Sequence, residues 1–491
     1  MAQNVHVNWG KIEKASRRTQ ATGIIGRDAN GFYVLAQKTI GRDEVYLEKY
    51  DNKSNRIFQK ELTFPAPDGK KVNFEKLIMV DGQMLMFTSF YNRKLDKNYA
   101  FVTKVSNNGE SDKSFKQIDE ITAEKKRNNG NFDFILSHDS TKILVYHNEP
   151  YEKNAQERFS VKVMDKNLNF IWEKDISVPF RDKDFRISDY TVSNDNKVYM
   201  LARIQEGNRE KKGGRPNYKY IILSYGEKDK TPNEYLVSLG EKFISDINFQ
   251  LNNQNNLVCA GFYSLKNSSG VGGTFYMTID SKTKAVTNKS VKDFDEKILG
   301  QFMSERKARK NNSELQNYDL RKLITKEDGG SVLVAEQYYV VEHTYTDKNG
   351  THTTYYYHYN DVILVDIAKS GEINWVSRIP KMQVTANDGG YYSSFAICVY
   401  KDKINLVYND NKKNIEKYDP KKLRSMGKVK KTVTMLVTVD SKGKYTKTPL
   451  FTNKKKAAIA RPKLYLQTTK DEMVMQAIKG RNFMYGALRF E

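Results

Sequence analysis

The stretch LRKLITKEDGGSVLVAEQYYV, residues 320–340, contains two apolar segments separated by a short turn rich in acidic residues and glycine. Both segments are rich in Val, Leu, Ile or Tyr, which favour the half-buried surface of a β-sheet. Asp and Gly at such a turn are typical of two antiparallel strands. A third apolar segment, DVILVDI (361–367), and a more charged fourth, INWVSRIP (373–380), follow. The stretch therefore predicts the beginning of a four-stranded antiparallel unit.

The second strand of this unit recurs along the chain. Comparable runs start at Phe32, Met84, Ile143, Val198, Leu257, Val332, Ile404 and Met473, with steps of 52, 59, 55, 59, 75, 72 and 69 residues. Four antiparallel strands repeated in this way, with a charged outermost strand, describe the blades of a β-propeller. We predict an all-β fold with one propeller domain over residues 1–491 and eight four-stranded blades, with seven as the alternative. The predicted blades are approximately 19–65, 72–121, 131–179, 185–240, 241–293, 318–380, 391–452 and 460–491, the last together with 4–12.

The last unit contains three strands and then the chain ends, whereas VNWGKI (7–12) precedes the first unit. VNWGKI shares its Asn-Trp pair with the fourth strand INWVSRIP. We therefore predict that the N-terminal strand completes the C-terminal blade and closes the ring. An extra edge strand on the first blade is the alternative.

The long insertions all fall on connections of one class. Five of them join a second strand to a third: 147–159, 203–220, 263–275, 336–360 and 409–433. A helix predicted over Asp293–Leu315, within an insertion of 293–317, lies between two blades and carries Phe294, Ile298, Leu299, Phe302 and Met303 at helical spacing. Because strand direction alternates, these connections share one face of the disc. Insertions gathered on one face usually mark the side that binds.

That face is predicted to be basic and aromatic. The hairpin from Tyr338 to Tyr359 is too long for a blade and is expected to project. Tyr and Arg dominate protein interfaces, so we predict contact with a protein partner, with solvated decoration as the alternative. The candidate partner-binding residues are Arg209, Lys211, Arg215, Phe302, Arg306, Tyr339, Tyr345, Tyr355, Tyr357, Lys421 and Arg424.

The sequence predicts no catalytic residue, metal or cofactor. Three of the six histidines, His343, His352 and His358, lie on the long hairpin, but their spacing matches no standard zinc site and alternate hairpin residues face opposite sides. Cys259 and Cys398 lie in apolar runs, and no GxSxG motif is present. Glycoside hydrolysis by a pair of carboxylates remains an alternative, because only the distance between two carboxylates in the folded protein would test it.

The net charge of +23, from 82 basic and 59 acidic residues, favours acidic partners. Nucleic acid is one such partner, but lysine-rich solvated strand faces account for much of the charge. We therefore predict no nucleic-acid binding.

The region from FDEKILGQFMSERK through YYYHYNDVILVDIAKSGEINWVSRIPKMQVTANDGGYYSSFAICVYKDKINLVYNDN, about 293–411, resembles a family of secreted proteins from bacteria with the type 9 secretion system. One member of that family closes the periplasmic end of the outer-membrane translocon. The resemblance implies a non-enzymatic periplasmic protein, a monomeric propeller that docks on and occludes an outer-membrane barrel protein and meets the membrane only through it. A secreted glycan-binding or glycan-processing propeller is the alternative. The opening MAQ agrees with export, since a small residue followed by Gln3 is typical of a signal-peptidase product.

Overall fold

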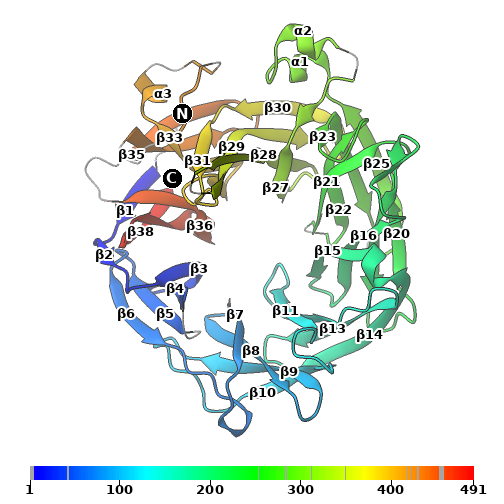
Figure 1. Cartoon of the computed structure of the whole chain (residues 1–491), viewed down its shortest axis with the longest axis vertical. Coiled ribbons are helices and arrows are strands. Elements are labelled where there is room, and N and C mark those ends of the chain that lie inside the picture. The colour runs from blue at the N-terminus through cyan, green and yellow to red at the C-terminus, as the bar shows by residue number, and fades with distance from the viewer. Residues whose placement is uncertain are drawn as a thin grey trace.

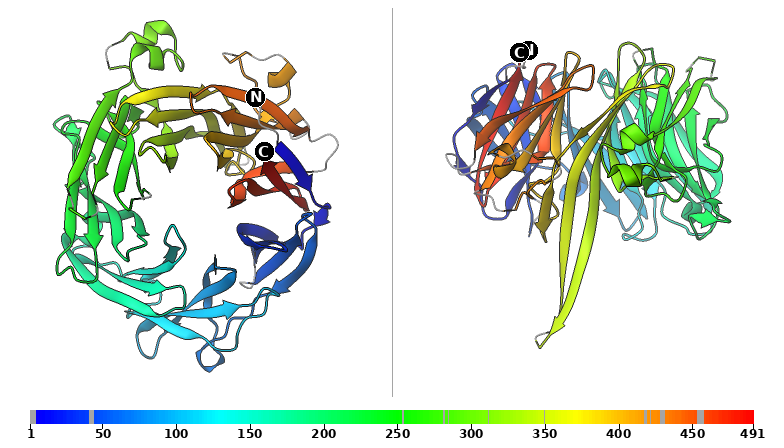
Figure 2. Two further views of the ribbon diagram at one scale, coloured as in Figure 1. Left: turned by 180° about the vertical axis from the view of Figure 1, so that it is seen from behind. Right: turned by 90° about the horizontal axis from the view of Figure 1, so that it is seen from above.

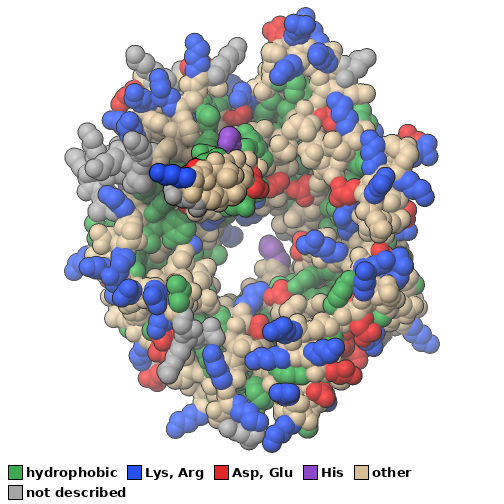
Figure 3. Space-filling model, viewed as in Figure 1, with side chains coloured by type: hydrophobic (Ala, Val, Ile, Leu, Met, Phe, Trp, Pro, Cys, Tyr) green, Lys and Arg blue, Asp and Glu red, His purple; other side chains and the backbone are tan. Residues whose placement is uncertain are grey.

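A computed structural model describes residues 5–40, 44–252, 254–280, 282–283, 285–310, 312–348, 350–416, 419–420, 422–427, 431–452 and 458–491. Antiparallel sheets stand side by side around a central opening (Figure 1), which stays open in the space-filling view (Figure 3). This is the arrangement of a β-propeller. Among the described residues, no helix has both the length and the apolar character needed to cross a membrane.

Four sheets of four strands come from the first half of the chain. The first contains β3 (Thr19–Asp28), β4 (Gly31–Lys38), β5 (Val45–Asp51) and β6 (Arg56–Glu61), and the second β7 (Asn73–Val80), β8 (Gln83–Asn92), β9 (Lys97–Val105) and β10 (Lys116–Thr122). The third contains β11 (Asn131–Leu136), β12 (Lys142–Asn148), β13 (Gln156–Asp165) and β14 (Phe170–Arg181). The fourth contains β15 (Phe185–Val192), β16 (Val198–Gln205), β19 (Tyr218–Tyr225) and β20 (Asn233–Val237).

The second half of the chain forms the other large sheets. The fifth contains β21 (Phe243–Leu251), β22 (Leu257–Ser264), β24 (Gly273–Ile279) and β25 (Val286–Asp293), and the sixth β27 (Tyr318–Thr325), β28 (Ser331–Asp347), β29 (Gly350–Ile367) and β30 (Ile373–Ile379), with β31 (Gln383–Ala386) added to β29. The seventh contains β32 (Phe395–Tyr400), β33 (Lys403–Asn411), β34 (Thr432–Val439) and β35 (Tyr445–Thr452). The eighth contains β36 (Ile459–Thr469), β37 (Glu472–Lys479), β38 (Asn482–Phe490), β1 (Val5–Trp9) and β2 (Glu13–Lys14).

Outside the two helices of the insertion at 293–317, the remaining elements are short. They are the strand pair β17 (Lys211–Lys212) with β18 (Arg215–Pro216), the pair β23 (Gly270–Val271) with β26 (Leu315–Gln316), the helix α3 (Lys413–Glu416), and the 3-10 turns at Pro67–Gly69 and Asp182–Asp184.

The two ends of the chain lie side by side. β1 pairs antiparallel with β38, from Val5 opposite Phe490 to Trp9 opposite Gly486. The Trp9 indole packs against Gly486, where a Cβ atom would lie 2.5 Å from Cε3 of the ring, and meets the Phe451 ring edge-on at 4.8 Å. The N-terminal strand is therefore the outer strand of the C-terminal sheet, as the shared Asn-Trp pair predicts.

The hydrophobic core lies between neighbouring sheets. One cluster joins the third and fourth sheets through Trp172, Phe185 and Tyr225, and corresponding clusters join the other neighbours along the chain. Another joins the last sheet to the first, through Tyr485 and Phe32 among others. The continuous apolar runs are buried on both faces because each sheet packs on two others.

The prediction of one helix over Asp293–Leu315 is wrong. The insertion contains two short helices, α1 (Glu296–Leu299) and α2 (Glu305–Ala308). Asp295 caps α1 by accepting the N–H of Ile298 at 2.8 Å, and Gly300, a poor helix former, ends it. Ser304 has an extended backbone and starts α2. The predicted apolar stripe nevertheless packs on the core between the fifth and sixth sheets.

Candidate interaction surface

The most prominent feature of the surface is a two-stranded hairpin that extends far beyond the disc (Figure 2). It is formed by the outer parts of β28 and β29, paired from Tyr338 opposite Tyr359 to Asp347 opposite Gly350. We call residues 338–359 the arm. The chain termini lie at the opposite face of the disc (Figure 2). The arm therefore projects, as expected, from the face that carries the long insertions.

The register divides the aromatic residues of the arm between its two faces. Tyr339 stacks on His358 at 4.4 Å, and Tyr345 stacks on His352 at 5.1 Å, on one face. Tyr355 and Tyr357 belong to the other face, opposite Glu342 and Val340. The four predicted arm tyrosines are thus brought onto one element, but they do not form one patch.

The expectation that the arm histidines face opposite sides is wrong. His343 pairs with Thr354, while His352 and His358 pair with Tyr345 and Tyr339, so all three belong to the same face. The number of residues between two positions on different strands does not show whether they share a face. The pairing register across the turn decides this. Within the described ranges, no group of three His, Cys, Asp or Glu side chains is close enough to hold a metal ion.

A buried polar cluster fixes the root of the arm. The Lys381 ammonium donates to Glu336 at 2.7 Å, to the Tyr359 carbonyl at 2.8 Å and to Gln383 at 3.0 Å. The other oxygen of Glu336 accepts the Ser394 hydroxyl at 2.7 Å. Neither Glu336 nor Lys381 has an exposed side chain. Burial lowers the pKa of Lys381, against the attraction of Glu336.

The root is also held by backbone and ring contacts. β31 pairs with β29 from Gln383 opposite Tyr359 to Ala386 opposite Tyr356. Gly390 lies against the Tyr359 ring at a φ of +66°, and a Cβ atom there would lie 2.2 Å from Cε2. Lys463 donates to the Tyr359 hydroxyl at 2.7 Å. An isolated hairpin is marginally stable in water, so these contacts are what give the arm a fixed direction.

The insertions of neighbouring sheets meet around this root. The loop of the fourth sheet contacts that of the fifth, through Lys211 on the Lys266 carbonyl at 3.3 Å and Ser268 on Glu210 at 2.7 Å. β23, which lies between β22 and β24 of the fifth sheet, pairs with β26 beside the helical insertion. On the other side of the arm, the Ser425 hydroxyl accepts the N–H of Val384 at 3.1 Å. We call the arm and these flanking insertions the insertion surface.

The predicted basic residues are spread over this surface. Arg209, Lys211 and Arg215 are exposed, but Arg215 pairs with Glu241 at 2.5 Å and Lys211 lies 5.8 Å from the Phe243 ring centre. Arg306 is exposed on α2, and Arg424 is exposed beside Asn414, which accepts its backbone N–H at 2.8 Å. Lys421 lies outside the described residues. Lysine and arginine are distributed around the ring on this face rather than gathered in one patch (Figure 3).

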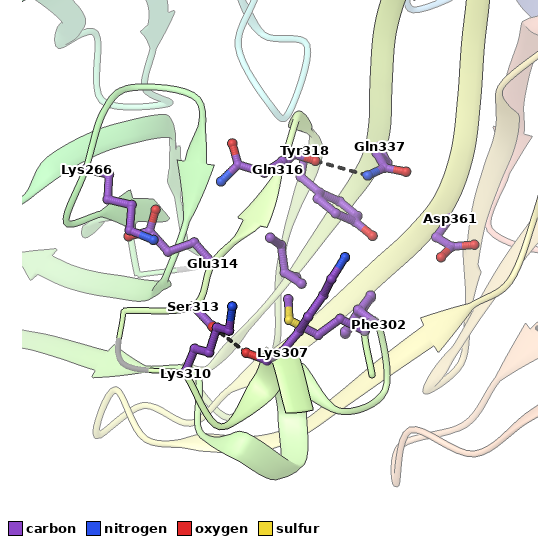
Figure 4. Close-up of a pocket in the computed structure, with 12 residues that line it drawn as sticks. Lys266, Phe302, Lys307, Lys310, Ser313, Glu314, Gln316, Tyr318, Gln337 and Asp361 are labelled. Carbon is purple, nitrogen blue, oxygen red and sulfur yellow. Dashed lines mark hydrogen bonds between the residues drawn. The ribbon is translucent and has the colours of Figure 1, made fainter. Parts of the chain in front are cut away.

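Phe302 contributes to packing more than to the exposed surface. Its ring meets Tyr318 edge-on at 6.1 Å, and the Arg378 guanidinium lies 5.8 Å from its centre. It forms one wall of a cavity of about 470 Å³ beneath the helical insertion (Figure 4). The cavity is lined by Lys266, Phe302, Met303, Lys307, Lys310, Ser313, Glu314, Leu315, Gln316, Tyr318, Gln337 and Asp361.

Sequence reasoning missed this cavity. Its lining comes from the loop after β22, the helical insertion, β26, β27 and the arm root, which are far apart in sequence. The basic residues at the end of the insertion were the only sequence feature that pointed to the cavity. They are explained equally well by their favourable interaction with the negative end of a helix dipole.

The two thiols are not placed for catalysis. Cys259 and Cys398 are both fully buried within strands of the fifth and seventh sheets. Burial raises the pKa of Cys398 to about 12, and burial also raises the pKa of Cys259. A thiol in such surroundings stays protonated at neutral pH and is a poor nucleophile.

No family model and no curated protein matches the sequence. Solved structures resemble the fold weakly. The WD40 domain of SCAP from fission yeast is 9% identical, with 99% of this chain and 98% of that chain covered at a TM-score of 0.41. The β-propeller domain of the Trilobed protease from Pyrococcus furiosus is 10% identical (89% and 97% covered, TM-score 0.36), as is polysaccharide lyase Uly1 (87% and 94%, TM-score 0.35). At these scores the likeness carries no functional argument.

Proposed function

We propose that the large sheets are eight blades of one ring, which β1 closes by completing the last blade. The cluster between the last and first sheets supports this, since Phe32, Tyr50 and Tyr485 pack together there. The chain also continues from β1 toward the first sheet, with Glu13 paired to Arg56 at 2.7 Å. In a closed ring every blade packs on two neighbours, which gives a rigid base.

On this base, we propose, the protein acts as a non-enzymatic interaction protein whose insertion surface docks on a protein partner. The observation that carries the proposal is the arm, a long exposed hairpin whose root is fixed by the buried Glu336–Lys381 pair. Exposed aromatic and apolar side chains stand along it, among them Val340, Tyr345 and Tyr355. An element ordered before binding loses little conformational entropy on binding, which suits a docking element.

The partner we propose is the outer-membrane barrel of a type 9 secretion translocon, which the propeller would occlude from the periplasm in the manner of a Plug subunit. The sequence resemblance over about 293–411 supports this choice, and that region contains both the arm and the helical insertion. A broad, rigid disc suits the covering of a wide pore, and an arm at its face suits entry into the pore mouth.

Affinity purification from the native cell envelope tests this proposal. The tagged chain should recover an outer-membrane barrel protein, identified by quantitative mass spectrometry. A variant with residues 342–355 replaced by an Asn-Gly turn should recover much less of it, because that turn closes a short hairpin and keeps residues 356–359, which pair with β31 at the root. Recovery of no barrel protein by the full chain would refute the proposed partner.

A further inference from the structure

The cavity under the helical insertion lies beside the root of the arm. Gln337, the last residue of β28 before the arm, lines it, together with Tyr318 at the start of β27 and Gln316 in β26 (Figure 4). Lys307 of α2 and Lys310 just after it line the side formed by the insertion. The cavity thus connects a basic rim to the arm.

The positive charge of this rim is only partly balanced within the site, because Glu314 is bound by neutral donors and keeps its own charge. Lys266, Lys307 and Lys310 are exposed and have no ion-pair partner among the described residues. The two carboxylates in the lining already have partners, which are described next. Three ammonium groups around one cavity therefore favour an anionic ligand.

Glu314 is 8% exposed and accepts the Ser264 hydroxyl at 2.8 Å and the N–H of Leu265 at 2.7 Å. Asp361 pairs with Arg378 at 2.7 Å and accepts the N–H of Lys381 at 3.1 Å. Both carboxylates therefore hold the walls of the cavity in place.

A free strand edge leads to this cavity. β27 pairs with β28 only from Ser331 to Gln337, and the N–H of Tyr338 donates to Asn317 at 2.8 Å. Beyond that point, no described strand pairs with the outer edge of β28 up to Asp347. That edge contains no Lys, Arg or Pro. Natural sheets protect long exposed edges with Pro and charged residues, and between Tyr338 and Thr346 this edge has one charged residue, Glu342, so it favours a strand partner.

The direction of such a partner follows from the topology. A segment that pairs antiparallel with β28 must run in the same direction as β27, from the arm tip toward the root. Its C-terminal end then approaches Asn317 and Gln316, where the lysine-lined cavity begins.

We propose that the cavity binds the C-terminal carboxylate of an extended polypeptide segment that pairs antiparallel with the outer edge of β28. This rests on the proposed docking function and specifies its ligand. Backbone hydrogen bonds along the arm supply sequence-tolerant affinity, and charge-assisted bonds from Lys266, Lys307 and Lys310 select a free chain end.

Two peptide pools test the inference on the full chain. Both contain random sequences of about ten residues, one with a free C-terminal carboxylate and one amidated, and both are passed over the immobilised protein. Retained peptides are quantified by mass spectrometry. We expect about tenfold greater retention of the free-acid pool.

Two variants of equal charge change complete the test. The double variant Lys307→Glu with Lys310→Glu should abolish the preference, whereas Lys94→Glu with Lys113→Glu, on exposed residues of the second sheet and its loops, should keep it. Equal retention of the two pools, retention of neither, or an unchanged preference in the first variant would overturn the inference. If that first variant still recovers the barrel protein from the envelope as the parent does, the inference fails while the proposed function stands.

Discussion

The Lys381 ammonium lies 2.7 Å from the Glu336 carboxylate, and both side chains are completely buried at the root of the arm. Two charges are taken out of water at this point, and they are compensated by each other, by Ser394, by Gln383 and by the Tyr359 carbonyl. Because Glu336 belongs to β28 and Lys381 lies between β30 and β31, the pair joins the arm to the segment that braces it.

Removing one member of this pair should destabilise the protein strongly. Glu336→Ala leaves a buried ammonium without its carboxylate, and we expect a loss of about 3 to 5 kcal/mol in the free energy of unfolding. Glu336→Leu combined with Lys381→Met should recover most of that loss, because no unpaired charge stays buried. Urea unfolding measures both. A double variant no more stable than the single one would contradict the role assigned to the pair.

The contact between Trp9 and Gly486 predicts a coupled pair of substitutions. Gly486→Ala should destabilise the protein by about 1 to 3 kcal/mol, because its Cβ atom would lie 2.5 Å from the indole ring. In a Trp9→Ala background the same change should cost much less, since the ring is gone. Thermal unfolding of the four proteins gives the coupling energy. Purely additive effects would mean that β1 does not pack on β38 as described.

The repeated strands, and the pairing of the N-terminal strand with the last sheet, could be predicted because they depend on local patterns. Each strand can be identified from residues within or next to it. Examples are the apolar run from Val332, the turn before that run, and the Asn-Trp pair at Trp9 and at Trp375. The length of the helix was overestimated because the apolar spacing runs up to Met303, whereas the backbone becomes extended at Ser304 and interrupts the helix.

The insertion surface was predictable only in part. The projection of the arm follows from the length of its hairpin, but the Glu336–Lys381 pair joins residues 45 positions apart. The lysine-lined cavity likewise assembles Lys266 and Lys310 from separate insertions. No local pattern shows which distant side chains will meet, since that is decided by how neighbouring blades pack.

Stability should depend on pH through His147. This buried ring lies 2.5 Å from Asp119, and Lys162 pairs with the same carboxylate at 3.0 Å. Burial alone would lower the pKa of His147, but the hydrogen bond with Asp119, supported by Glu149, raises it to about 9. A raised histidine pKa stabilises the fold fully below the unfolded value of about 6.5, and the contribution is lost as pH rises through 9.

His147→Gln should therefore lower the free energy of unfolding by about 2 to 3 kcal/mol near pH 6. The difference from the parent should shrink as pH rises from about 6.5 to above 9. His352→Gln, at an exposed position of the arm, is the matched control and should change little at any pH. A constant difference across this range would show that His147 is not charged in the folded protein.

The arm should be dispensable for folding. Replacing residues 342–355 with an Asn-Gly turn keeps Glu336, Lys381 and the residues 356–359 that pair with β31 in place, so we expect a melting temperature within about 4 °C of the parent. Differential scanning calorimetry measures it. A much larger decrease would mean that the arm is part of the structural core rather than a docking element.

Photo-crosslinking in living cells of the native organism tests the central claim most directly. A benzophenone amino acid replaces exposed Tyr345 on the arm, or exposed Asp402 in the turn between β32 and β33, which strand direction places on the opposite face. We predict that the Tyr345 variant forms an adduct with an outer-membrane barrel protein and that the Asp402 variant does not. Docking through the arm would be contradicted if only the Asp402 variant formed a barrel adduct, or if neither variant formed one.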